Sequence, residues 1–336
     1  MHMADALISP AVGGTMTVVT GAVAVYCAKK VKEDLDQSKV PLMGVLGAFI
    51  FAAQMVNFSI PGTGSSGHLG GGMILTILLG PYAAFLVMAS VLGVQALFFA
   101  DGGLLALGAN VFNLGFFPAF IAYPLIYRRI VGKDPGRNKL VAGAIAAAVV
   151  GLLLGAFGVV LETTASGISA LPFTTFVGAM LPIHLAIGIV EGLVTAGVVL
   201  FVKGARPELL ERVSARKPLG GLDLKPILVG LLIAAVVAGG ALSWFASSNP
   251  DGLEWSIGGV TGSEELEGAG SPVHDASASL QGKTAFLPDY GFKDAAESQA
   301  NAGTSTSGIV GGAITLGVAG LIGFVLKKRS AARTAA

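Results

Sequence analysis

The sequence has little of what soluble and secreted proteins usually contain. Of its 336 residues only 12% are charged and one is a cysteine, Cys27, so a disulfide framework and a cysteine metal cluster are both excluded. The net charge of +1 gives no reason to expect a nucleic-acid partner. With 53% hydrophobic residues and a mean hydropathy of +0.77, the composition instead predicts an all-α polytopic membrane protein.

Signatures of enzymes and pumps are missing too. The chain contains no G-x-x-x-x-G-K-[ST] phosphate loop and no H-E-x-x-H motif, so we expect no ATP hydrolysis by that route and no zinc protease chemistry. No pair of intramembrane carboxylates and no obvious two-fold repeat suggests a proton-coupled antiporter. We therefore predict a protein that is not an enzyme.

Apolar stretches predict the membrane spans. Those long enough to cross about 30 Å of hydrocarbon are 11–28, 41–58, 81–100, 103–127, 138–160, 174–202, 226–246 and 308–326. A shorter stretch, 70–79, precedes Gly80-Pro81 and reads as a short span or re-entrant helix paired with 81–100. The count is then seven crossings up to residue 202 and nine in total.

Basic residues predict the orientation. Lysine and arginine cluster in 29–39, 128–139, 203–225 and 327–329, which should be cytoplasmic. The segment before the first span and the loops 59–69, 101–103 and 161–173 carry neither residue, which places them outside. We therefore expect a multi-pass protein of the cell membrane, in contact with lipid, with its N-terminus outside and its C-terminus cytoplasmic.

A change in composition divides the chain into two parts. Residues 1–205 form the predicted seven-span body, and 206–336 form a two-span accessory module. Between the last two spans lies an outside loop of about 247–306, rich in glycine, serine, alanine and acids. Glycine pairs such as Gly151 and Gly155 share a helix face and predict close helix packing.

The N-terminus offers unusual metal chemistry. No basic residue precedes the first span, so Met1-His2 is not the start of a secretory signal and should be retained. A free Met1 amine, the His2 backbone nitrogen and one His2 ring nitrogen can chelate a metal in fused five- and six-membered rings. A fourth nitrogen in the plane would give the tetragonal field that Ni(II) or Cu(II) prefers. The alternative is that His2 is simply the second residue of a frayed terminus.

His68 is the candidate for that fourth nitrogen. It stands in the uncharged, glycine-rich segment 61–72, on the same predicted side as the N-terminus. Neutral imidazole is a common metal ligand, and its other nitrogen usually needs an acceptor. Residues available for that outer role are Asp5, Asn57, Ser65 and Ser66. The alternative is a loop histidine at the membrane surface.

Other polar residues have simpler interpretations. Asp101 can cap a helix N-terminus. His184 and Glu191 lie seven residues apart on one helix face, which favours structural contacts over metal binding. His274, in the acidic loop beside Asp275, is interpreted as a surface residue. Asn110 and Asn113 can hydrogen-bond neighbouring helices.

These motifs together resemble the substrate-binding membrane component of energy-coupling factor cobalt/nickel transporters, the CbiM/NikM family. The resemblance covers about residues 1–205 and rests on residues 1–10, 66–72, 80–81, 94–103 and 107–111. The segments 249–254 (Asn-Pro-Asp-Gly-Leu-Glu) and 287–292 resemble the small two-span accessory component, of the NikN or PDGLE type, here fused to the first.

The resemblance implies a ligand set, a cargo and partners. The ligands would be the Met1 amine, the His2 amide and imidazole, and the His68 imidazole, with Ni²⁺ or Co²⁺ as the transported substrate. The partners would be a transmembrane coupling subunit and two ATP-binding-cassette (ABC) ATPase subunits. Cobalt members often carry a Ser-Cys-Ser-His-type loop and a His-Gly-Gly, whereas this chain has Ser-Ser-Gly-His at 65–68 and Asp-Gly-Gly at 101–103, so nickel is favoured.

Two other hypotheses stay open at this stage. A copper-binding membrane sensor or chaperone would use the same four nitrogens, because Cu(II) outranks nickel in the affinity order. A polytopic scaffold with incidental histidines would need no metal.

Overall fold

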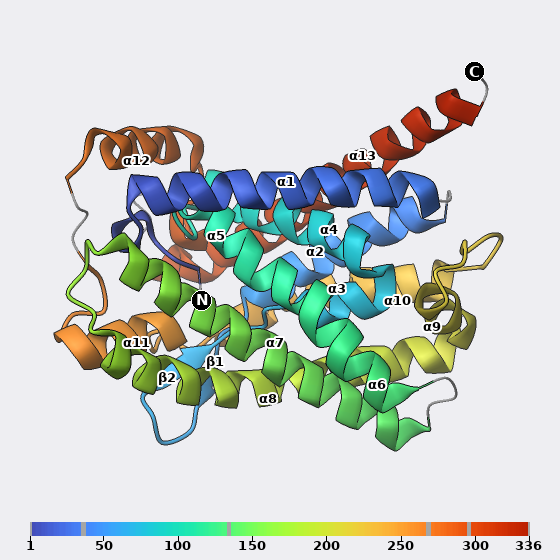
Figure 1. The fold of residues 1–336 in the computed structure, drawn as a ribbon, viewed down its shortest axis with the longest axis horizontal. Coiled ribbons are helices and arrows are strands. Elements are labelled where there is room, and N and C mark those ends of the chain that lie inside the picture. The colour runs from blue at the N-terminus through green and yellow to red at the C-terminus, as the bar shows by residue number, and fades with distance from the viewer. Residues whose placement is uncertain (1, 35–37, 133–135, 267–269, 294–296, 335–336) are drawn as a thin grey trace.

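The computed structural model describes residues 2–34, 38–132, 136–266, 270–293 and 297–334 (Figure 1). The α-helices are α1 (Pro10–Asp34), α2 (Lys39–Gln54), α3 (Gly72–Leu79), α4 (Pro81–Val94), α5 (Leu107–Val111), α6 (Arg128–Val131), α7 (Arg137–Ser166), α8 (Phe173–Ala205), α9 (Pro207–Ser214), α10 (Lys225–Gly240), α11 (Gly252–Thr261), α12 (Pro272–Thr284) and α13 (Ala300–Thr334). Two π-helical segments, η2 (Gln95–Phe99) and η3 (Phe112–Tyr127), continue α4 and α5. Short 3-10 turns are η1 (Asp5–Leu7), η4 (Leu242–Phe245), η5 (Pro288–Tyr290) and η6 (Glu297–Gln299).

The long helices follow the apolar stretches. In the described part of the chain, 6 helical segments are long and apolar enough to cross a membrane, and α2 and α10 are shorter apolar helices. The eight residues of α3 are all buried, and at about 1.5 Å per residue this helix is too short to cross alone. The protein is thus a mostly helical, multi-pass membrane protein, and the count of seven plus two crossings stays a prediction.

Two segments expected to be irregular are ordered. Residues 58–67 form an antiparallel hairpin, β1 (Phe58–Ile60) with β2 (Ser65–Gly67), so the fold is not purely helical. Gly62 and Gly64 have φ of 77° and 74°, a conformation that favours glycine and turns the hairpin. The outside loop of the accessory module contains α11 and α12.

The accessory helices pack on the body. Both α10 and α13 lie against α2, and a Cβ added to Gly44 of α2 would stand 3.0 Å from the Leu316 carbonyl oxygen of α13. Where α10 meets α13, a Cβ on Gly308 would lie only 2.3 Å from the Gly239 carbonyl oxygen. Glycine at these contacts lets the helix backbones approach closely, as expected for packing in lipid.

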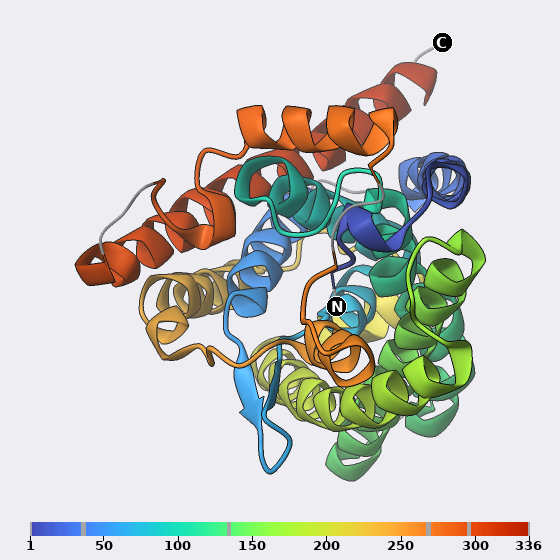
Figure 2. The ribbon, with the colours of Figure 1, turned by 90° about the vertical axis from the view of Figure 1, so that its left-hand side faces the viewer.

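The two ends of the molecule differ in charge. The N-terminal segment, the hairpin, α11 and α12 gather at one end (Figure 1), and the N-terminal segment enters the middle of that end (Figure 2). Basic residues of helices α1, α2 and α6 and of the segment after α9 meet in a different pocket, lined by Lys30, Lys39, Arg128, Arg216 and Lys217. The predicted outside and cytoplasmic segments are thereby grouped, while the orientation itself stays a prediction.

Candidate metal centre

Backbone contacts hold the N-terminal segment in place. Met3 donates its amide to Asn110 Oδ1 at 2.8 Å, and its carbonyl accepts from Asn110 Nδ2 at 3.1 Å and from the Gly103 amide at 2.9 Å. Asn110 therefore anchors the chain end and not a neighbouring helix. Gly103 must be small, because a Cβ there would lie 1.8 Å from Asp5 Oδ1. These contacts fix where the His2 side chain can reach.

His2 is buried against Asp101. Its Nδ1 lies 2.8 Å from Asp101 Oδ1, while its Nε2 is buried and has no hydrogen-bond partner in the described part of the chain. Burial acts to raise the pKa of Asp101, but the His2 imidazole and the bond from Tyr290 outweigh it and hold that pKa well below its ordinary value. Asp101 follows Ala100, whose φ of 55° ends η2. The expected helix-capping role of Asp101 is therefore replaced by a contact with a candidate ligand.

His68 lies beside His2, just after strand β2. The two imidazole rings stack with centroids 4.9 Å apart and planes 23° apart. His68 Nδ1 is 3.1 Å from the Leu69 carbonyl oxygen, which requires a donor, so the lone pair belongs to Nε2. Burial lowers the pKa of His68 to about 3, which keeps the ring neutral near neutral pH. The structure thus brings together the two histidines that the sequence paired.

A buried carboxylate holds the backbone next to His68. Glu191 of α8, 3% exposed, accepts from the amides of Gly70 at 3.0 Å and Gly71 at 3.1 Å. Gln54 donates to the Gly70 carbonyl at 2.9 Å. His184, on the same face of α8, has Nδ1 2.8 Å from the Met180 carbonyl oxygen. Both α8 residues make the structural contacts that their spacing favoured.

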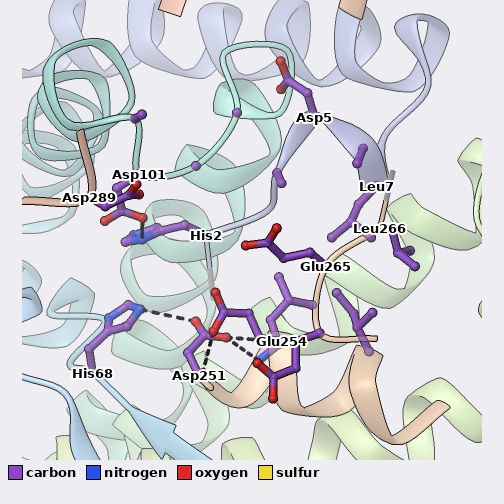
Figure 3. A pocket seen from close by; sticks show the side chains of 18 of the residues that line it. His2, Asp5, Leu7, His68, Asp101, Asp251, Glu254, Glu265, Leu266 and Asp289 are labelled. Carbon is purple, nitrogen blue, oxygen red and sulfur yellow. Dashed lines mark hydrogen bonds and ion pairs between the residues drawn. The ribbon is translucent and has the colours of Figure 1, made fainter. Parts of the chain in front are cut away.

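The accessory module reaches this centre through α11. Asp251 caps that helix, with Oδ1 accepting from the amides of Leu253 at 2.7 Å and Glu254 at 3.0 Å. Its other oxygen, Oδ2, lies 3.8 Å from His68 Nε2 (Figure 3). Burial acts to raise the pKa of Asp251, but neighbouring positive charge and the hydrogen bond from the Glu254 amide together hold it below its ordinary value.

Further accessory contacts close over the N-terminal segment. From α12, His274 Nε2 lies 3.1 Å and 3.0 Å from the carbonyl oxygens of Asp5 and Ile8, and Ser277 donates to Asp5 Oδ2 at 2.5 Å. Tyr290 donates to Asp101 Oδ2. The interpretation of His274 as a surface residue is wrong, since it is 6% exposed.

The side chains of three of the four residues proposed for the outer role have other partners in the structure, and the fourth, Asn57, lines the cavity. Asp5 Oδ1 accepts from the Ala106 amide at 3.0 Å, and Ser66 Oγ donates to the Asn249 carbonyl at 2.8 Å. Ser65 Oγ donates to the Ser66 carbonyl, and Asn57 lies in the wall of the cavity beside the histidines. The side chains that do face the imidazoles are Asp101 and Asp251, which the sequence alone did not assign. Met1 lies outside the described residues.

The centre opens into a cavity of about 540 Å³. His2 and His68 line it together with carboxylates of both parts of the chain, and Figure 3 shows the side chains converging. These carboxylates are Asp5, Asp101, Asp251, Glu254, Glu264, Glu265 and Asp289. Among the described side chains, no group of three or more His, Cys, Asp or Glu is arranged to hold a metal ion.

Comparison with known proteins identifies the class as membrane transporters of transition metals. A solved structure titled as a truncated transition metal transporter is 32% identical and superposes with a TM-score of 0.55, covering 61% of this chain and 99% of that chain. Residues 2–209 match the CbiM family model, described as the cobalt uptake substrate-specific transmembrane region, and the chain belongs to this family. Residues 225–328 match the PDGLE domain, so the predicted fusion with an accessory module is confirmed.

Relatives with the same fusion carry nickel in their names. The putative fused nickel transport protein NikMN of Archaeoglobus fulgidus is 35% identical over 347 residues and covers 100% of both chains. The probable fused nickel transport protein LarMN of Lactiplantibacillus plantarum is 34% identical, over 76% of this chain and 78% of that protein.

Proposed function

We propose that this chain is the substrate-capture subunit of an ATP-driven importer of the energy-coupling factor type, with Ni(II) preferred over Co(II). The observation that carries the proposal is the stacking of buried His2 on buried His68, 4.9 Å apart, at a cavity lined with carboxylates. Nickel is preferred because relatives that share the fusion are named nickel transport proteins. Energy would come from a coupling subunit and two ABC-type ATPases.

The ligands would be four nitrogens in a plane. With Met1 as a free N-terminus, its amine, the His2 amide nitrogen and His2 Nδ1 form the chelate, because only Nδ1 closes a six-membered ring with its own backbone nitrogen. His68 Nε2 would take the fourth position, since Nδ1 faces the Leu69 carbonyl. In the structure Asp101 holds His2 Nδ1, so loading requires the His2 ring to turn and exchange this carboxylate for the metal.

Metal capture would take place at the outer face. The cavity and the N-terminal segment would lie outside, with the basic pocket near Arg128 and the C-terminus in the cytoplasm. A copper-binding sensor would use the same nitrogens and is separated from an importer by transport with the partner subunits.

The test compares two N-termini from one preparation. A cleavable fusion is removed to leave either Met1 first or Gly-Pro before it, and Ni(II) binding is measured by calorimetry. The extension turns the Met1 amine into an amide, and its proline has no amide hydrogen to lose, so no new chelate that starts at the added amine replaces the old one. Affinity should then fall by more than about a hundredfold, beyond the usual cost of losing an outer partner of a ligand. His68→Ala should lose binding to a similar degree.

Thermal unfolding without metal is the control, and it should not change with the added Gly-Pro. If the extended chain binds nickel as tightly as the native one, the chelate is excluded.

A further inference from the structure

We propose that Asp251 of the accessory module supplies a carboxylate oxygen to the divalent metal bound by His2 and His68. This proposal rests on the proposed function and extends it, because it makes the metal site a joint product of both parts of the chain.

The distance between the two candidate donors fits a shared ion. In zinc sites, metal–nitrogen and metal–oxygen bonds are about 2.0–2.2 Å long, so two donors on one ion lie at most about 4.3 Å apart. Asp251 Oδ2 and His68 Nε2 are 3.8 Å apart, and their side chains are 16% and 9% exposed. A single ion can therefore reach both atoms with only a small movement of the side chains.

The Asp251 carboxylate is also oriented. Oδ1 is engaged by the first amides of α11, and the Asp251 amide donates to Glu254 Oε2 at 2.9 Å, completing a capping box. These bonds fix the carboxylate plane so that Oδ2 is turned toward His68 (Figure 3). The cap thus presents an oxygen at a defined place, as metal ligands require.

Contacts between the modules fix α11 to the His68 loop. The Ser66 amide donates to the Pro250 carbonyl at 2.8 Å, and Trp255 Nε1 donates to the Thr63 carbonyl at 3.0 Å. Gly252 packs so closely on α8 that a Cβ there would lie 2.9 Å from Ile187 Cδ1 and 3.1 Å from His184 Cε1. Asp251 and His68 are therefore held by neighbouring, mutually bonded segments.

A second, independent observation points to a ligand at this place. His2, whose side chain is 7% exposed, lines the same cavity as His68 and Asp251, and its buried Nε2 has no hydrogen-bond partner among the described residues. An unsatisfied buried ring nitrogen is costly. When the His2 ring turns, Nδ1 can bind the ion and Nε2 can donate to Asp101, so the unsatisfied nitrogen indicates a place built for a bound ion.

The Asp251 carboxylate can offset the net charge of the bound ion. A divalent ion bound by a deprotonated His2 amide leaves one net positive charge in a buried place, which is unfavourable unless an anion accompanies it. The Asp251 carboxylate neutralises that charge. The fitting substrate is a divalent first-row transition ion that accepts imidazole as well as carboxylate, and not Mg²⁺, which prefers oxygen alone.

The test is Asp251→Asn in the full chain with Met1 as its first residue. Asparagine caps helices about as well as aspartate, so α11 should persist while the charged oxygen is lost. Asp275→Asn is the matched control, because Asp275 is an exposed acid in the first turn of α12. Nickel affinity is measured by calorimetry, and the metal geometry by X-ray absorption at the nickel edge.

The expected result is a loss of nickel affinity of at least about tenfold in Asp251→Asn and native affinity in Asp275→Asn. The native chain should give the absorption edge of nickel with an added oxygen ligand. Asp251→Asn should give the edge of a planar four-nitrogen site. Unchanged affinity, or lower affinity with an unchanged edge, would overturn the proposal. If the asparagine variant does not fold, Asp251→Ser, which also keeps a capping oxygen, takes its place.

The two proposals fail differently. If the native chain binds no nickel, the proposed function is wrong. If the native chain binds nickel and Asp251→Asn binds it equally well, the function stands and the role of Asp251 does not.

Discussion

The body and the accessory module meet at the candidate metal centre with different chemistry and different support. The body contributes both imidazoles together with the Asp101 carboxylate, and Asn110 and Glu191 hold the neighbouring backbone inside the bundle of long helices. The accessory module contributes carboxylates and a phenol, carried by short segments such as α11 and η5. The contrast suggests that nitrogen donors decide whether metal binds, whereas oxygen donors of the accessory module adjust how tightly.

The largest loss of nickel affinity within this comparison should come from changing Asp101, which contacts His2 of the body and Tyr290 of the accessory module. Asp101→Asn removes the charge that accepts from Tyr290 and that would accept the Nε2–H of His2 once the ring has turned and Nδ1 binds the metal. Losing such an outer partner typically costs about 10–100-fold in metal affinity. Tyr290→Phe removes only the accessory bond to Asp101 and should cost less. Calorimetry with Ni(II) measures both, and a Tyr290→Phe loss larger than that of Asp101→Asn would break the proposed order.

Acidification should lower the nickel affinity only by protonating the nitrogen ligands. The N-terminal amine, with an ordinary pKa of about 8, and the His2 amide must release protons on binding. Affinity should therefore fall by about tenfold or more per pH unit from pH 7 to 5.5, because protons compete increasingly as pH falls. His68, with its pKa lowered to about 3, stays neutral in this window, and Asp251, with a lowered pKa, stays charged.

The slope should be the same in Asp251→Asn as in the native chain, although the affinities differ. A pH-independent affinity in the native chain would instead indicate binding by oxygen ligands only.

The smallest expected effect is on stability, and it tests how tightly α11 packs on the body without changing a metal ligand. Gly252→Ala forces a Cβ against Ile187 and His184 and should lower the stability by about 1 kcal/mol, at the low end for overpacking, since the nearest atom ends a flexible side chain. Gly259→Ala, in the same helix with nothing within 4 Å of an added Cβ, is the matched control. It should be neutral or slightly stabilising. Thermal unfolding in detergent compares them, and equal midpoints would show that α11 is not tightly docked.

The sequence predicted those features that depend on local pattern. Hydropathy located the long helices, and the distribution of basic residues placed His2 and His68 on one side, where the structure stacks them. The signals of α11 and α12 were also present, since Asp251 and Glu254 form a capping box and Ser271-Pro272 is a typical helix start. The composition of 247–306 nevertheless favours an irregular loop, and it outweighs these local signals in a prediction from sequence.

The outer partners of the histidines could not be predicted. His2 and Asp101 are 99 positions apart, and Tyr290 and Asp101 are 189 apart. Such contacts depend on the π-helical end of η2 at Ala100 and on how α11 and α12 fold back over the body. Proximity along the chain favours Ser65 and Ser66, whose hydroxyl groups donate to backbone carbonyls in the structure.

Because both parts belong to one chain, α11 needs only a weak docking affinity for the body to keep Asp251 beside His68. Were the accessory module a separate subunit, dilution would separate it from the body. Residues 206–224, which include helix α9, tether it to the body, and even a short flexible linker would give an effective concentration on the order of millimolar. A docking constant as weak as about 0.1 mM would then keep the carboxylate at the histidines roughly nine-tenths of the time, while still allowing α11 to leave and return whenever the ion has to pass.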